Sequence, residues 1–297
     1  MWVSFPGFEQ KLITVSSDDG SIAISCQVGG SGPPVLLLHG FPQTHAIWRH
    51  LAPELAKHYT VIASDLRGYG GSSKPHGKAD HSTYSKRAMA ADQVALMKAL
   101  GHEQFFLLGH DRGGRVSHRM AMDYPETIQK LMVLDISPTL TMYENTSMEF
   151  AKGYWHWIFL IQPEPIPETM IGANPQYWLE NHMGRHAGTG IFSPDAWSEY
   201  LAGASNPESM HAMCEDYRAA ATIDLVHDRA DRELGKKLGM PLHVLWGEHG
   251  LVHKCFKPLE DWKKVSNQVT GKALACGHYI PEELPAELLN EARQFFN

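Results

Sequence analysis

The segment Gly109-His110-Asp111-Arg112-Gly113 places a carboxylate between two glycines, directly after the apolar run Phe105 to Leu108. The residues that follow, Gly114 to Tyr124, are typical of a helix. A sharp turn between a strand and a helix, called a nucleophile elbow, exposes its central side chain to substrate. A carboxylate there can attack saturated carbon and form an ester. The sequence therefore predicts a nucleophilic Asp111 acting on an epoxide or on an sp³ carbon with a leaving group, and argues against hydrolysis of peptides and simple esters.

Polar residues also follow other apolar runs of the chain. His39-Gly40-Phe41-Pro42 follows one run, Asp65 to Gly70 follows the next, and Cys276-Gly277-His278 follows the last run and precedes the final helix. His278 comes after the nucleophile in the chain order expected for the general base of such a site. We expect it to deprotonate the water that hydrolyses the ester on Asp111.

A carboxylate must hold the imidazole of His278 in the correct tautomer, and the sequence offers two candidates. Asp135 ends the apolar run that begins at Leu131, whereas Glu248 follows the run Leu242 to Trp246. We favour Asp135, because an Asp is unusual at the end of an apolar strand and the segment after Trp246 has no Asp at the turn. Glu248 stays open as the alternative.

Two arginines, Arg112 and Arg115, flank the nucleophile. Two guanidinium groups beside Asp111 make little sense for an apolar haloalkane, but they suit a substrate that is itself a carboxylate, which an arginine can bind through two hydrogen bonds. Such binding would also orient the α-carbon of the substrate toward Asp111. The alternative is that one arginine pairs with a structural acid.

Donor side chains occur later in the chain, in Trp155-His156-Trp157 and Asp216-Tyr217-Arg218. Indole, imidazole and phenol groups can together stabilise a departing anion. Fluoride is a small and strongly basic acceptor, and it needs such donors more than bromide does. The alternative for each of these aromatic residues is a role in core packing.

The elements that must position these residues follow from the hydrophobic pattern. Alternation in Ile13-Thr14-Val15 and in Ile22-Ala23-Ile24 predicts a hairpin that turns at Asp18-Asp19-Gly20. Six further runs are continuously apolar, which indicates strands buried on both faces of a parallel sheet: Pro34 to Leu38, Tyr59 to Ala63, Gln104 to Leu108, Leu131 to Ile136, Leu242 to Trp246 and Lys272 to Ala275. Helices are expected between them, including Tyr84 to Leu100 and Pro281 to Phe296, so the fold class is α/β.

Residues 138–223 interrupt this alternation, because they are rich in Trp, Met, His and Pro and are typical of helices and loops. An insertion after the strand that ends near Asp135 would lie over the carboxyl ends of the strands, where open α/β sheets bind ligands. We therefore expect a core domain formed by residues 1–137 and 224–297 and a helical cap domain formed by residues 138–223.

The composition narrows the class of protein. The 297 residues are 43% hydrophobic and carry a net charge of −7, without a dense basic patch, so we expect no nucleic-acid partner. The four cysteines form no CxxC pattern, and we expect reduced thiols. His182 and His186 are four residues apart but lack the Glu of a zinc-protease motif, so no metal and no cofactor is expected. The chain shows no signal peptide and no transmembrane run, and we expect a cytoplasmic protein that does not bind membranes.

The motifs around the candidate site resemble those of the fluoroacetate (haloacetate) dehalogenases of the α/β-hydrolase family. The resemblance rests on His39 to Gln43, Asp65 to Gly70, Gly109 to Arg115 and Trp155-His156-Trp157, and it extends from about Phe8 to the C-terminus. It implies an α/β-hydrolase fold with a mostly parallel eight-stranded sheet and an inserted helical cap. It also implies a homodimer and a small haloacid as substrate.

The resemblance implies a role for each site residue. Asp111, His278 and Asp135 are the implied catalytic residues, and Arg112 and Arg115 the residues that bind the substrate carboxylate. His156, Trp157 and Tyr217 are the implied halide ligands, with Phe41 and Arg112 expected at the oxyanion hole. Two other readings remain: an epoxide hydrolase, in which a Trp usually occupies the position of Arg112, and a binding module, which typically lacks a triad member.

Overall fold

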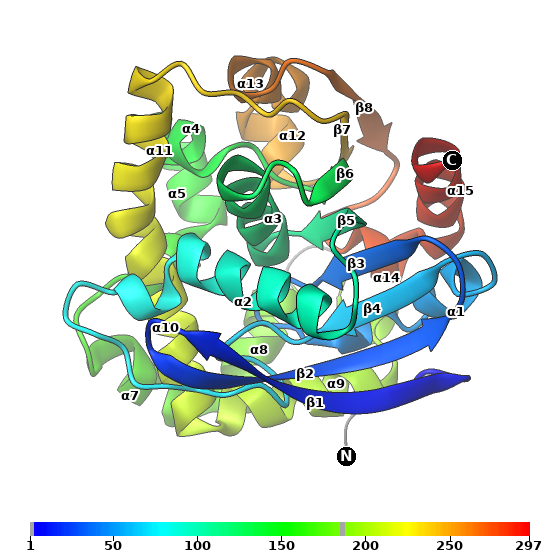
Figure 1. Ribbon diagram of the computed structural model, residues 1–297. Helices are drawn as coiled ribbons and strands as arrows, with labels where there is room; N and C mark the ends of the chain where they lie inside the picture. The colour runs from blue at the N-terminus through cyan, green and yellow to red at the C-terminus, as the bar shows by residue number, and fades with distance from the viewer. Residues whose placement is uncertain (1–2, 185–187) are drawn as a thin grey trace.

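The computed structural model describes residues 3–184 and 188–297 and contains a single eight-stranded sheet in that part of the chain (Figure 1). The strand order is β1-β2-β4-β3-β5-β6-β7-β8. The strands are β1 (Phe8–Ser17), β2 (Gly20–Gly30), β3 (Pro34–Leu38), β4 (Thr60–Ser64), β5 (Phe105–His110), β6 (Ile128–Leu134), β7 (Leu242–Gly247) and β8 (Val269–Leu274). β2 pairs antiparallel with β1 and β4, and all other pairs are parallel. The predicted hairpin and the mostly parallel sheet are confirmed.

Both faces of the sheet are buried, which is why the central strands are continuously apolar. In β3, Leu36 and Leu38 pack into one hydrophobic core with residues of α2 (Lys86–Ala99) and α3 (Arg112–Asp123). Val35 and Leu37 point the other way and pack with residues of α1 (Ala52–Leu55) and α15 (Pro285–Phe296). The side chains of β3 therefore alternate between two cores although every one of them is apolar.

Short elements complete the core. They are the 3₁₀ helices η1 (His45–Trp48) and η2 (Ser82–Tyr84) and the helices α12 (Leu251–Cys255), α13 (Pro258–Val265) and α14 (Ile280–Glu283). The helix predicted from Pro281 to Phe296 is wrong as a single element. It consists of α14 and α15, which are separated at Leu284. Pro285 explains the break, because proline has no N–H to continue a helix and disfavours helical geometry in the residue before it.

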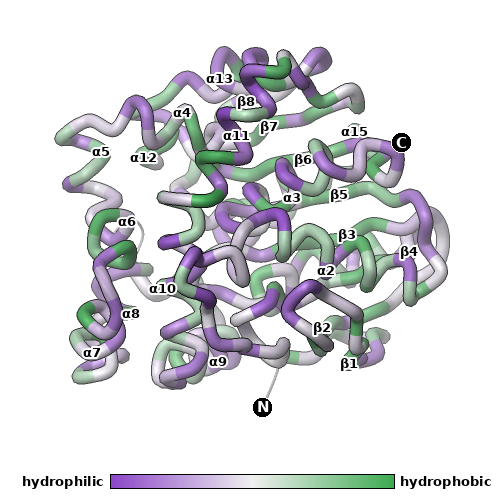
Figure 2. The backbone as a smooth tube through the Cα atoms, turned by 60° about the vertical axis from the view of Figure 1, so that its left-hand side comes forward, coloured by the Kyte–Doolittle hydropathy of each residue, from purple (hydrophilic) through white to green (hydrophobic). Residues whose placement is uncertain are grey.

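Helices fill the chain between β6 and β7, as the interruption of the pattern predicts. They are α4 (Thr139–Glu144), α5 (Met148–Gly153), α6 (Trp155–Leu160), α7 (Ile166–Gly172), α8 (Pro175–Met183), η3 (Thr189–Ile191), α9 (Pro194–Ser205), α10 (Pro207–Ala221) and α11 (Ile223–Glu233). Figure 2 shows α6, α7 and α8 gathered on one side of the molecule, apart from the stacked strands β5 and β6. The predicted cap boundary at residue 223 falls at the first residue of α11, and the division into two domains stays a prediction.

Two sequence-based expectations concern what the chain can bind or cross. In residues 3–184 and 188–297, every helix is too short or too polar to traverse a lipid bilayer. His186, which is spaced four residues from His182, lies outside the described residues.

Candidate active site

Asp111 lies between the end of β5 at His110 and the start of α3 at Arg112. Its backbone has φ 46° and ψ −113°, a conformation that a residue with a side chain rarely adopts. Such strain persists only where the surrounding structure enforces it, and it is concentrated at functional sites. Here the end of β5 and the start of α3 hold Asp111 in the turn between them.

The loop after β3 closes on this carboxylate. The backbone N–H of Phe41 donates a hydrogen bond to Asp111 Oδ2 at 3.0 Å. The preceding residue must be glycine, because a Cβ on Gly40 would lie 2.6 Å from the Cβ of Asp111. Phe41 therefore holds one carboxylate oxygen, and its N–H is positioned to stabilise negative charge that develops there.

The pKa of Asp111 is lowered despite its burial. Burial alone would raise that pKa, but the electrostatic influence of His278 and the positive charges of Arg115 and Arg112 outweigh it and lower the pKa below the usual value of 3.8. The carboxylate is therefore ionised at neutral pH, which is the form that a nucleophile requires.

His278 lies next to Asp135, one of its two predicted partners. Nδ1 of His278 is 2.5 Å from Asp135 Oδ2, and the other oxygen of Asp135 accepts the N–H of Gly247 at 3.0 Å. A proton on Nδ1 leaves Nε2 as the basic nitrogen. Glu248, the alternative, has a side chain that is 44% exposed and pairs with His249 at 3.7 Å. The geometry thus brings Asp135, and not Glu248, to the imidazole.

Arg112 is fully buried and pairs with an acid of the predicted cap. Its Nε and Nη2 donate to Asp216 Oδ1 at 3.1 and 2.5 Å, and Nη2 also reaches the carbonyl oxygen of Asp216 at 2.8 Å. Lys86 forms a second ion pair with the same carboxylate. Burial would raise the pKa of Asp216, but these two cations lower it. The alternative of a structural acid beside one arginine is therefore realised, although Nη1 of Arg112 is buried without a partner among the described residues.

Arg115 has no carboxylate partner among the described residues, and neutral acceptors surround it. Nη1 donates to Thr139 Oγ1 at 3.0 Å and to the carbonyl oxygen of Ser137 at 3.3 Å, and Nη2 contacts the sulfur of Met142 at 3.1 Å. Its Nε is buried and has no acceptor within the described part of the chain. Burial lowers the pKa of Arg115, and the nearby charge of Arg112 lowers it further. A buried charge whose hydrogen-bond partners are all neutral is a favourable place for an anion.

The three residues implied as halide ligands gather over these arginines. The guanidinium of Arg112 lies 4.2 Å from the ring centre of Tyr217, and that of Arg115 lies 4.7 Å from the ring centre of Trp157. His156 stacks on Phe41 with ring centres 6.0 Å apart, and contacts Tyr217 at 5.7 Å. All three side chains are buried. The structure brings them together above the elbow, and they contribute packing as well as donor groups.

The sequence does not indicate several contacts of the site. Asp216 and Lys86 position Arg112, while the hydroxyl of Tyr154 lies 3.4 Å from Nδ1 of His278. His110 Nε2 holds the backbone oxygen of His278 at 2.8 Å. Each contact joins segments more than 100 residues apart, so neither spacing nor periodicity could have indicated it.

Known proteins resemble this chain in sequence and in fold. A family model for the alpha/beta hydrolase fold matches residues 33–285, and the chain belongs to that family. A fluoroacetate dehalogenase from Burkholderia sp is 45% identical over 99% of this chain and 95% of its own length. A soluble epoxide hydrolase from Corynebacterium sp. (strain C12) is 32% identical over 90% of this chain and 91% of its own. The crystal structure of ALR0039 from Nostoc sp PCC 7120 superposes with a TM-score of 0.94 at 47% identity, covering 98% of both chains.

The family and the sheet confirm the predicted fold, an α/β-hydrolase fold with eight mostly parallel strands flanked by helices. The relatives support hydrolase activity on a small molecule, and they include one fluoroacetate dehalogenase and several epoxide hydrolases.

Proposed function

We propose that the protein hydrolyses haloacetates, including fluoroacetate, to glycolate and halide through an ester on Asp111. The observation that carries the proposal is the pair of buried guanidinium N–H groups, Arg112 Nη1 and Arg115 Nε, which have no acceptor among the described residues and which flank an ionised carboxylate. A buried charged donor without an acceptor is costly, and a substrate carboxylate supplies the acceptor. The name of the Burkholderia relative supports the same substrate class.

The reaction proceeds in two displacements. An oxygen of Asp111 attacks the CH₂ carbon of the haloacetate, the carbon–halogen bond breaks, and the halide leaves with its electron pair. His278, oriented by Asp135, then takes a proton from water, and the resulting hydroxide attacks Cγ of Asp111. The N–H groups of Phe41 and Arg112 would stabilise the oxyanion that forms on Asp111. The bond from Cγ to the ester oxygen then breaks, the departing glycolate oxygen takes a proton from His278, and the second proton of the water is released as the Asp111 carboxylate is restored.

His156, Trp157 and Tyr217 act on the first displacement. Negative charge on the halogen grows only as its bond to carbon breaks, so donors placed there stabilise the transition state more than the bound substrate. Burial raises the pKa of Tyr217 well above 10, so that its phenol keeps the proton that it would donate to fluoride.

An epoxide hydrolase is the second candidate, and the Corynebacterium relative favours it. It would use the same Asp111 nucleophile and would protonate the opening oxide from Tyr154 or Tyr217. An epoxide such as styrene oxide has no carboxylate, however, and would leave Arg112 Nη1 and Arg115 Nε without the acceptor that a carboxylate supplies. The cytoplasmic location, the homodimer and the cap boundary that we expect from the sequence stay predictions.

The test compares substrates and paired variants. We expect the protein to release fluoride from fluoroacetate, measured with an ion electrode, and to act poorly on chloroacetamide and styrene oxide. Arg115→Lys and Arg112→Lys keep the charge but lose the planar guanidinium, so each should lower kcat/KM for chloroacetate by about 10- to 100-fold. Arg232→Lys, at an exposed ion pair, serves as the control. Rapid styrene oxide hydrolysis without fluoride release would favour the second candidate.

A further inference from the structure

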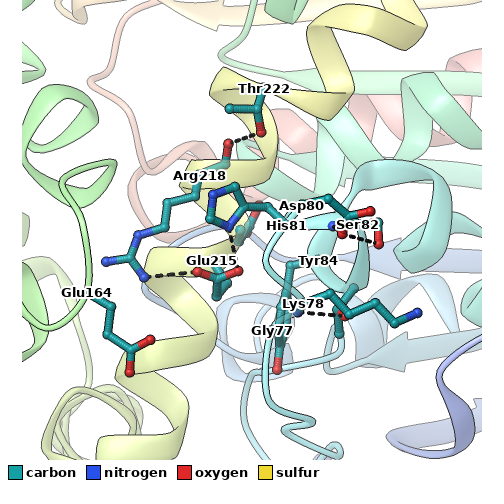
Figure 3. Close-up of polar contacts among 12 residues, drawn as sticks. Gly77, Lys78, Asp80, His81, Ser82, Tyr84, Glu164, Glu215, Arg218 and Thr222 are labelled. Atoms are coloured by element: carbon teal, nitrogen blue, oxygen red, sulfur yellow. Dashed lines mark hydrogen bonds and ion pairs between the residues drawn. The ribbon is translucent and has the colours of Figure 1, made fainter.

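A second cluster of ligating side chains lies where a loop of the core meets the cap. His76 comes from the loop between β4 and η2, Glu164 from the turn between α6 and α7, and His211 from α10. One ligand atom from each lies within 4.8 Å of the other two. They border a cavity of about 480 Å³ that is also lined by His81, Glu215 and Arg218. Figure 3 shows Gly77 and His81 of the core loop beside Glu164, Glu215 and Arg218 of the cap.

His211 is the inner member of this cluster. Its Nδ1 is buried without a hydrogen-bond partner in the described part of the chain, and it faces Glu164 Oε1 at 3.6 Å and Glu168 Oε1 at 3.7 Å. Both distances are too long for a hydrogen bond. They match the separation of two atoms on one zinc ion, which is roughly 3.2–3.7 Å when each bond is about 2.0–2.2 Å long.

The neighbouring charges select Glu164 as the carboxylate that is available. Arg218 neutralises Glu168 at 2.7 Å and Glu215 at 3.0 Å, and His81 also reaches Glu215 at 2.9 Å. Within residues 3–184 and 188–297, Glu164 has no lysine or arginine partner, and its carboxylate pairs with His211 alone. An ion bound there would therefore not have to break a strong ion pair.

His76 presents the correct nitrogen for a metal. Its Nδ1 lies 3.1 Å from the carbonyl oxygen of Gly77, and donation of the Nδ1 proton to that oxygen leaves the lone pair on Nε2. Metal-bound histidines usually hold their second ring nitrogen in this way. The side chain is exposed, so it can move the short distance that coordination requires.

We propose that His76, Glu164 and His211 form a binding site for a divalent transition-metal ion such as Zn²⁺, which fastens the core loop at residues 74–81 to the cap. Two imidazoles and one carboxylate are a ligand set that zinc accepts, with water in the fourth position. Because the three residues come from distant segments, no sequence spacing indicates the site. The site lies outside the Asp111–His278–Asp135 group and does not depend on the reaction proposed above.

Coordination would change one contact of the core loop. The N–H of Gly77 now donates to Nε2 of His211 at 3.3 Å, which places the ring proton on Nδ1. When Nδ1 binds the ion, the proton resides on Nε2, and the Gly77 amide has to turn away. Zinc binding should therefore change the backbone conformation of the loop at residues 74–81.

The experiment is a calorimetric titration of the chelator-treated full chain with Zn²⁺. We expect one ion per chain, with affinity reduced by about 10-fold or more in His76→Ala, Glu164→Gln and His211→Ala. His58→Ala, at an exposed histidine elsewhere, should bind as the unaltered chain does. If His211→Ala fails to fold, the zinc affinities of His76→Ala and Glu164→Gln test the site. Absence of saturable binding, or equal affinity in all variants, would overturn the site.

Hydrogen exchange tests the link between loop and cap. Zinc should change the exchange of backbone amides at residues 74–81 in the unaltered chain and leave it unchanged in His76→Ala. An unaltered chain that binds zinc without any change in this loop would contradict the fastening of the loop to the cap.

Discussion

At the scale of residues, the proposed reaction depends on buried charged groups, whose electrostatic interactions are stronger than they would be in water. The pKa of Asp111 is lowered by the nearby Arg115 and Arg112 guanidinium groups and by His278, and Arg112 donates to Asp216 while its Nη1 has no acceptor among the described residues. The residue types and order of Asp111, His278 and Asp135 could be predicted, because each follows an apolar run. The ion pairs of Arg112 and Lys86 with Asp216 could not, since they depend on how α2, α3 and α10 meet in space.

Trp157 gives a prediction at this scale. If its indole N–H stabilises departing fluoride, Trp157→Phe should lower kcat for fluoroacetate by on the order of 10²-fold, because that is the usual effect of losing one preorganised donor. Chloride is a better leaving group and needs the donor less, so the loss with chloroacetate should be much smaller. The measurement is kcat for both substrates on the same variant.

Packing is the competing role for Trp157, because its ring also lies over the guanidinium of Arg115. Phenylalanine keeps an aromatic face for that cation, so the variant separates the two roles. An equal fractional loss on both substrates would mean that Trp157 acts through packing and that the halide site lies elsewhere.

At the scale of elements, the elbow requires close approach of α3 to β3. A Cβ on Gly113 would lie 2.6 Å from the carbonyl carbon of Leu38, part of a backbone that the sheet holds in place. The apolar runs predict β3 and β5 well, because burial on both faces leaves no other pattern. The break between α14 and α15 was missed, because the apolar spacing continues through Leu284 while Pro285 interrupts the hydrogen bonds.

Gly113→Ala should therefore destabilise the fold by about 1–3 kcal/mol, the usual cost of overpacking, although alanine favours helices. Gly114→Ala is the matched control. Its Cβ would meet Cδ1 of Ile136 at 2.7 Å, the end of a side chain that can turn aside, and its nearest backbone contact, the oxygen of Gly109, is longer at 3.0 Å. Urea unfolding of both variants measures the difference. Equal stability of the two would show that the helix can move away from β3 without cost.

At the scale of the whole molecule, buried histidines connect stability to pH. Burial lowers the pKa of His118 from 6.5 to about 3, and that of His110 to about 3 as well. In the unfolded chain, His118 and His110 each bind a proton below about pH 6.5. In the folded chain, both imidazoles stay neutral until the pH is near 3. Between about pH 3 and 6.5 the unfolded state therefore binds more protons than the folded state. The contribution of these two histidines to the free energy of unfolding is greatest above pH 6.5 and decreases as the pH falls.

His118→Leu tests this dependence. Nε2 of His118 is buried without a partner among the described residues, and an apolar side chain removes both that cost and the titration. Below pH 6, the slope of the unfolding free energy against pH should decrease by about 1.4 kcal/mol per pH unit. Urea titrations at pH 7, 6 and 5 measure it, with the exposed His58→Leu as control. Parallel pH profiles for His118→Leu and the unaltered chain would contradict the lowered pKa.

The central claim is that Asp111 forms an ester that His278 helps to hydrolyse, and His278→Asn tests it most directly. The first displacement needs only the ionised Asp111, so this variant should release one equivalent of halide from chloroacetate and then stop. Mass spectrometry of the intact protein should show one added carboxymethyl group, and peptide mapping should locate it on Asp111. Protein that stays unmodified after incubation with chloroacetate, or that carries the group on another residue, would contradict the ester mechanism.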